Sequence, residues 1–113
     1  MNVTDINSIE DAKEAGREIW RHYGEREQII ALWKALNELS IKLSRAINEN
    51  YRLQNAINTI ADVEFLLIQV KEGIKVNQNV IDAKIIYKAR RTINKINKEK
   101  DLIKAVKSEE NKR

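Results

Sequence analysis

The chain contains no proline and only three glycines, Gly16, Gly24 and Gly73, among its 113 residues. These two residue types most often interrupt helices and form tight turns, so this chain has few places to change direction. Long helices joined by short connections fit such a composition better than many short strands. A length of 113 residues also suits one domain with a modest core. The sequence therefore predicts a small all-α protein made of a single domain, residues 1–113.

Apolar residues recur every three or four positions over four segments, which predicts four helices. The predicted helices span about residues 9–22, 25–48, 51–72 and 80–96. Ser8 has the residue type of a helix N-cap, and Gly24 is expected to end the first helix. The fourth helix can continue as far as Val106. Four helices with short connections predict a four-helix bundle.

The second and third predicted helices are the ones expected to form the core. In the second helix the apolar residues form one face and include Trp33, which we expect, like Trp20, to anchor the core. The third helix has only two charged residues between Ala56 and Val70, so we expect it to be the buried central helix. We expect a homodimer that forms through these two helices, because the third is too apolar for one small bundle to cover. The third helix also has a narrow polar stripe, made of Asn55, Asn58, Asp62 and Gln69.

The net charge of +4 is unevenly distributed along the chain. Residues 1–83 hold 10 Lys and Arg against 13 Asp and Glu, whereas residues 84–113 hold 11 against 4. Such a basic segment either binds a phosphate backbone or an acidic protein surface, or is a solvated helix face. Within it, Lys88, Arg91 and Lys95 are spaced three and four residues apart and share one face.

Several classes of site and location are excluded or disfavoured. The chain has no cysteine for a disulfide or a thiolate ligand, and its one histidine, His22, cannot build a zinc site alone. It has no run of eighteen apolar residues and no secretory signal pattern at its start, so we expect a cytoplasmic protein that does not bind membranes. One acidic pair remains of interest. If the second and third helices pack antiparallel, Glu38 and Asp62 approach each other, and two carboxylates on facing helices are the beginning of a magnesium site. Alternatively, both residues are surface charges.

Four short motifs connect this chain to a known family. They are Tyr23-Gly24-Glu25-x-x-Gln28-Ile29, Glu38-Leu39, Ile60-Ala61-Asp62-Val63-Glu64 and Lys88-x-x-Arg91. From about residue 20 to residue 96 the chain resembles the MazG-like all-α NTP pyrophosphohydrolases, especially the short phage and prophage forms; residues 97–113 form a basic C-terminal extension. The resemblance implies an oligomer of helical bundles that hydrolyses nucleoside triphosphates to monophosphate and pyrophosphate.

The family holds Mg²⁺ with an E-x-x-E motif on one helix and an E-x-x-D motif on the next. In this chain only the last residue of each motif, Glu38 and Asp62, is retained. The family also has a glutamate at the first position of each motif, where this chain has Ala35 and Thr59. At the position before each motif, where glutamate is common in the family, this chain has Lys34 and Asn58. Because Mg²⁺ sheds water reluctantly and needs carboxylate charge, we expect catalysis to be impaired or absent and no cofactor to be bound.

We therefore expect a pseudoenzyme that acts by binding a protein partner. The chain's composition and its resemblance to phage forms favour a phage-encoded inhibitor of a host defence system, such as a CRISPR effector or nucleotide signalling, in the host-cell cytoplasm. The alternative is an active Mg²⁺-dependent pyrophosphohydrolase, in which Glu38 and Asp62 bind the metal and Lys88, Arg91 and Lys95 bind phosphates. Nucleotide binding without turnover, and nucleic-acid binding by the basic C-terminal helix, are two further possibilities.

Overall fold

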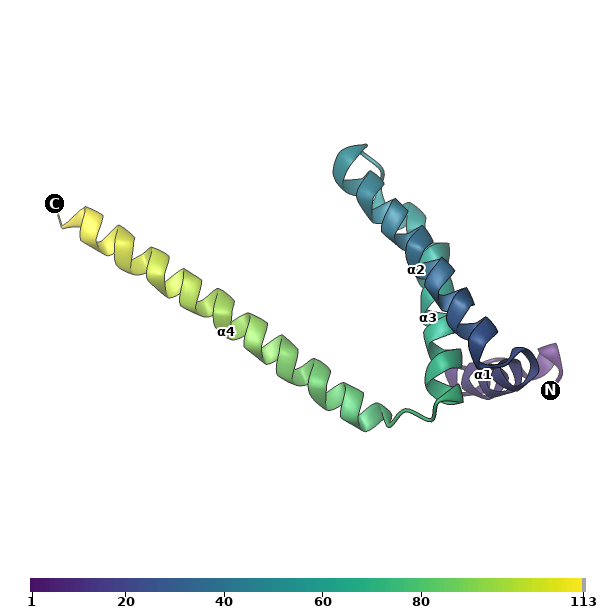
Figure 1. The fold of residues 1–113 in the computed structure, drawn as a ribbon. Coiled ribbons are helices and arrows are strands. Elements are labelled where there is room, and N and C mark those ends of the chain that lie inside the picture. Colours follow the sequence, from purple (N-terminus) through teal and green to yellow (C-terminus); the bar gives the residue numbers. More distant parts are fainter. Residues whose placement is uncertain (113) are drawn as a thin grey trace. The chain divides into compact units, whose positions relative to one another are not determined.

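The structure, a computed structural model, describes residues 1–112 and is entirely helical apart from its connections (Figure 1). Its α-helices are α1 (Ile9–Tyr23), α2 (Glu25–Asn48), α3 (Ile57–Gly73) and α4 (Gln78–Asn111). Two short 3₁₀ helices, η1 (Val3–Asp5) and η2 (Leu53–Ala56), precede α1 and α3. No strand occurs in the part of the chain that is described. The prediction of an all-α protein with four helices is confirmed.

Contacts divide the chain into two compact units. The first unit, Met1–Val76, contains α1, α2 and α3, and the second begins at Asn77 and contains α4. The organisation of residues 1–113 as one domain stays a prediction.

The local signals at the start of the chain act as the sequence indicates. Ser8 caps α1, because its Oγ accepts a hydrogen bond from the backbone N–H of Asp11 at 3.1 Å. Gly24 ends α1 with a φ of 86°, a left-handed value that residues with a side chain rarely adopt. Its N–H donates to the carbonyl of Trp20 at 2.8 Å. Gly24 is also the only residue between α1 and α2, so one glycine sets the change of direction between them.

The third helix starts later than predicted, at Ile57 and not near residue 51. Asn50 has a φ of 61°, and Arg52 is extended, so the chain leaves α2 through a turn that helical geometry cannot follow. The 3₁₀ helix η2 then leads into α3.

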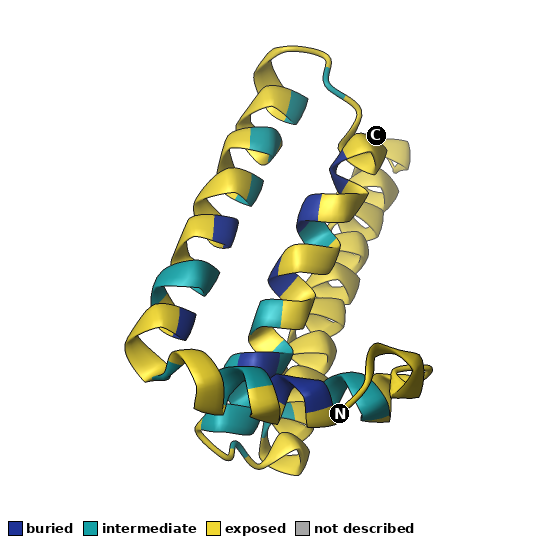
Figure 2. Cartoon of the chain, turned by 90° about the vertical axis from the view of Figure 1, so that its right-hand side faces the viewer, coloured by how far each residue is buried: buried dark blue, intermediate teal, exposed yellow. Residues whose placement is uncertain are grey.

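Helix α3 is the centre of the first unit, as its composition predicts. It contacts both α1 and α2; it runs antiparallel beside α2, and α1 lies across one end of this pair (Figure 2). Close approach of α3 to α1 relies on glycine at Gly73, since a Cβ there would overlap the Trp20 indole. A Cβ on Gly16 would meet the Gln69 backbone at 3.4 Å, an ordinary contact distance. The buried residues are small or polar, and they are Ala15, Gly16, Gln28, Ala35, Ala56, Thr59, Val63 and Gln69.

The expectation that Trp33 anchors the core is wrong, because its side chain is 61% exposed. On α2 the packed side runs through Gln28 and Ala35, whose positions differ from those of the apolar face. The large apolar residues are left on an exposed surface, here called the α2 seam: Ile29, Trp33, Leu36, Leu43 and Ile47.

In the second unit, α4 has 34 residues and none of them is buried. Asn77 caps it by accepting a hydrogen bond from the backbone N–H of Asn79 at 3.0 Å. Among residues 1–112, no helix is both long and apolar enough to cross a lipid bilayer.

Candidate functional site

Lys42 is the centre of the site that the family motifs point to, although the sequence motifs do not include it. Its ammonium lies 3.4 Å from Oε1 of Glu38, one turn earlier on α2. The same Nζ donates a hydrogen bond to Oγ1 of Thr59 on α3. The side chain of Lys42 is only 24% exposed, and Thr59 is 2% exposed. A cation of the protein itself therefore joins α2 to α3, in contact with Glu38 and Thr59.

The four motif positions divide into a buried pair and an exposed pair. Ala35 and Thr59, where the resemblance leads one to expect glutamate, are both buried in the first unit. Glu38 and Asp62, the two carboxylates of the compared motifs, are exposed. The interior of the site thus presents a methyl group and a hydroxyl, and the remaining carboxylates lie at its solvent side.

The two surviving carboxylates have different surroundings. The Glu38 carboxylate is paired with Lys42, whereas within residues 1–112 the Asp62 carboxylate takes part in no hydrogen bond or ion pair. The other two substituted positions, Lys34 and Asn58, are exposed. Lys42, and not Lys34, is the lysine whose ammonium contacts the Glu38 carboxylate.

These donors do not fit Mg²⁺. The ion needs near-octahedral oxygen ligands with carboxylate charge, and a neighbouring ammonium repels it. In the described part of the chain, no three acidic or histidine side chains come together as a group that could hold a metal. The arrangement instead satisfies one partly buried ammonium with a carboxylate and a hydroxyl, which is a structural contact between two helices.

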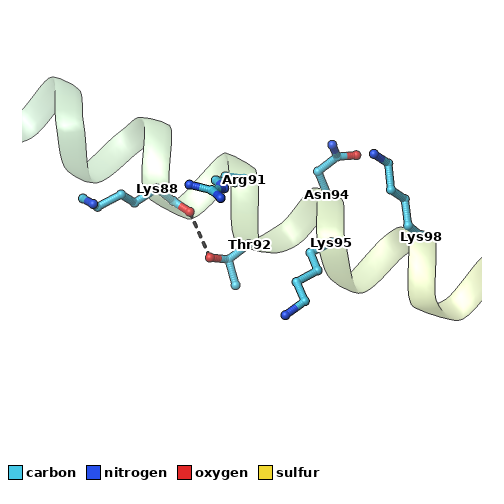
Figure 3. Close-up of a pocket in the computed structure, with 6 residues that line it drawn as sticks. All are labelled: Lys88, Arg91, Thr92, Asn94, Lys95 and Lys98. Atoms are coloured by element: carbon cyan, nitrogen blue, oxygen red, sulfur yellow. Dashed lines mark hydrogen bonds between the residues drawn. The ribbon is translucent and has the colours of Figure 1, made fainter.

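A second group of candidate residues lies on α4. Lys88, Arg91 and Lys95 line one shallow, open depression on the helix surface, as their spacing predicts (Figure 3). Thr92 supports this stretch with a hydrogen bond from its Oγ1 to the carbonyl of Lys88 at 3.0 Å. The motif analysis missed Lys98, which follows Lys95 by three residues and lines the same depression. Continuing the three-and-four spacing by one step identifies it.

Comparisons with protein-family models, with curated proteins and with solved structures find no match for this chain. The similarity to MazG-like proteins therefore rests on the four motifs in the sequence.

Proposed function

We propose that this chain is a catalytically inactive, MazG-like protein that acts by binding another macromolecule. One observation carries the proposal: the Lys42 ammonium contacts both Glu38 and Thr59, in the space between α2 and α3 where the family binds its metal.

Electrostatics makes this contact incompatible with metal catalysis. A divalent cation that entered beside Lys42 would be repelled by the ammonium and would compete with it for the Glu38 carboxylate. Buried Ala35 and Thr59 provide no negative charge in compensation. The free-energy cost of placing Mg²⁺ beside Lys42 is therefore not offset. Pyrophosphate release depends on this metal ion and is lost with it.

The α2 seam supports the binding role. Its residues follow one another at steps of four, three, seven and four, and Ser40 divides the step of seven into four and three. This is the spacing of a helix that packs along another helix. We propose that a second copy of the chain covers the seam and forms a homodimer. Light scattering of the full chain at micromolar concentration tests this, and a monomer would contradict it.

An assay for pyrophosphate release with Mg²⁺ and a panel of NTPs and dNTPs tests the lack of catalysis. We expect no release above a protein-free blank from the wild type, Asp62→Ala or Glu64→Ala. Glu64 is a matched control, because it is an exposed acid on the same helix. Release that is lost in Asp62→Ala but kept in Glu64→Ala would establish the alternative, an active pyrophosphohydrolase.

The nature of the partner follows from a separate experiment. If the chain is a phage-encoded inhibitor of a host defence complex, it should co-purify in a fixed ratio with that complex from host lysate. Nucleotide binding without turnover, at Lys88, Arg91 and Lys95, is tested by calorimetry with non-hydrolysable nucleotides, and absence of heat would exclude it.

A further inference from the structure

Helix α4 carries a row of cations that its own chain does not neutralise. Between residues 83 and 98 there are six basic residues and no acidic one. Five of the six lie along one side of the helix, here called the α4 basic stripe: Lys84, Lys88, Arg91, Lys95 and Lys98. All five are exposed, and within residues 1–112 none of them forms an ion pair.

The stripe is compact and straight. At 100° and 1.5 Å per residue, its five residues fall within an arc of about 80° and extend over about 21 Å. Like charges three and four residues apart on a helix repel each other, so this arrangement weakens α4 when it is free. A surface that only served solubility would intersperse acids among the bases, as α4 does beyond Lys98.

We propose that the α4 basic stripe binds the phosphate backbone of duplex DNA. This inference rests on the proposed binding function and names a class of partner for it. A duplex presents one negative charge per about 1.7 Å of its axis, a density that a row of closely spaced cations matches. The major groove, about 12 Å wide, admits an α-helix. Thr92 and Asn94, which line the same depression, supply the kind of polar side chain that contacts phosphates (Figure 3).

Two other anionic partners fit α4 less well. Single-stranded nucleic acids are held largely by stacking on aromatic rings, and Tyr87 is the only aromatic residue of α4. Helices that lie in a membrane surface bury a continuous apolar face rich in Trp, Phe or Leu. Between residues 83 and 98 the aliphatic residues of α4 are all isoleucines and alanines, and Lys100, Lys104 and Lys107 interrupt the apolar face further along. Duplex DNA is therefore the partner that the side chains favour.

Salt dependence is the quantitative signature of this contact. If each of the five cations neutralises one phosphate, the logarithm of the affinity falls with the logarithm of salt concentration with a slope of about −4.5. The affinity then drops about 500-fold between 50 and 200 mM salt. We would measure fluorescence anisotropy of a labelled 24-base-pair duplex of random sequence with the full chain.

A matched pair of triple variants assigns the binding to one face of α4. The variant Lys88→Gln/Arg91→Gln/Lys95→Gln should reduce the magnitude of the slope by about 2.7. The control removes the same charge from the other side of the same helix, as Lys100→Gln/Lys104→Gln/Lys107→Gln. We expect this control to keep most of the slope of affinity against salt concentration. Circular dichroism would check that both variants keep their helix.

Four results would overturn the inference. They are a flat salt dependence, equal losses of slope in the two triple variants, binding to vesicles with anionic lipid but not to the duplex, and tighter binding of single-stranded than of duplex DNA. None of these results bears on pyrophosphate release. The hydrolysis assay therefore distinguishes a failure of this inference from a failure of the proposed function.

Discussion

Replacing Lys42 by methionine tests whether the contact between α2 and α3 stabilises the first unit. Methionine keeps the length and much of the apolar stem of lysine but cannot donate a hydrogen bond or carry charge. The Thr59 hydroxyl, 2% exposed, then loses its partner on α2, and Glu38 loses its counter-ion.

The magnitude follows from the burial of each group. Removing the partner of a buried polar group costs about 1–2 kcal/mol of the free energy of unfolding. The ion pair with Glu38, whose side chain is 60% exposed, adds only about 0.3–0.5 kcal/mol, as exposed pairs four residues apart on a helix do. We therefore expect Lys42→Met to destabilise the unit by about 1.3–2.5 kcal/mol and Glu38→Gln by less than about 0.5 kcal/mol.

Urea denaturation followed by tryptophan fluorescence measures these values, because Trp20 and Trp33 both lie in the first unit. A double-mutant cycle with Thr59→Val isolates the hydrogen bond, and the double variant should be less destabilised than the sum of the single variants by about 1 kcal/mol. Lys34→Met is the matched control on the exposed side of α2 and should stay within about 0.5 kcal/mol of the wild type. The reasoning is refuted if Lys42→Met costs no more than Lys34→Met, or if the two single effects simply add.

Three further predictions concern other parts of the chain. Gly73→Ala should lower the free energy of unfolding by about 1–3 kcal/mol, because the new Cβ overlaps the Trp20 ring, whereas Gly16→Ala should be close to neutral. Chemical denaturation of both variants checks this difference, and equal effects of the two substitutions would contradict it. A hydrogen bond from the backbone N–H of Asn7 lowers the pKa of Asp11 below its ordinary value of 3.8. The contribution of the Asp11 carboxylate to stability is therefore complete above pH 3.8 and is lost as the pH falls through the lowered pKa. Thermal melts between pH 2 and 6 should show this loss in the wild type and not in Asp11→Asn. Amide hydrogen exchange should be faster throughout α4 than in the middle of α3, because α4 buries no residue, and slow exchange in α4 of the monomer would be the contrary result.

Local chemistry explains which features could be predicted from the sequence. Ser8 and Gly24 set the limits of α1 through a side-chain cap and a positive φ, which are properties of single residues. The bounds of α2 and the central place of α3 follow equally from pattern and composition. The start of α3 was less predictable, because the positive φ of Asn50 belongs to a turn that a residue other than glycine adopts only in context.

The features that were missed depend on which helix faces meet. Periodicity places Trp33 on an apolar face, but it does not say whether that face or the one with Gln28 and Ala35 packs inside the unit. Lys42 was missed for the same reason, although it follows the motif position Ala35 by seven residues, the spacing of one helix face.

The absence of any buried residue on α4 has a consequence for how this chain can evolve. Substitutions in a packed helix are limited by the shapes of its neighbours, whereas those on α4 need only preserve helix propensity and capping. Charges there can be gained, lost or reversed without changing any buried residue of the helix. Mutation can therefore alter the charge that this helix presents while its own helical fold is kept.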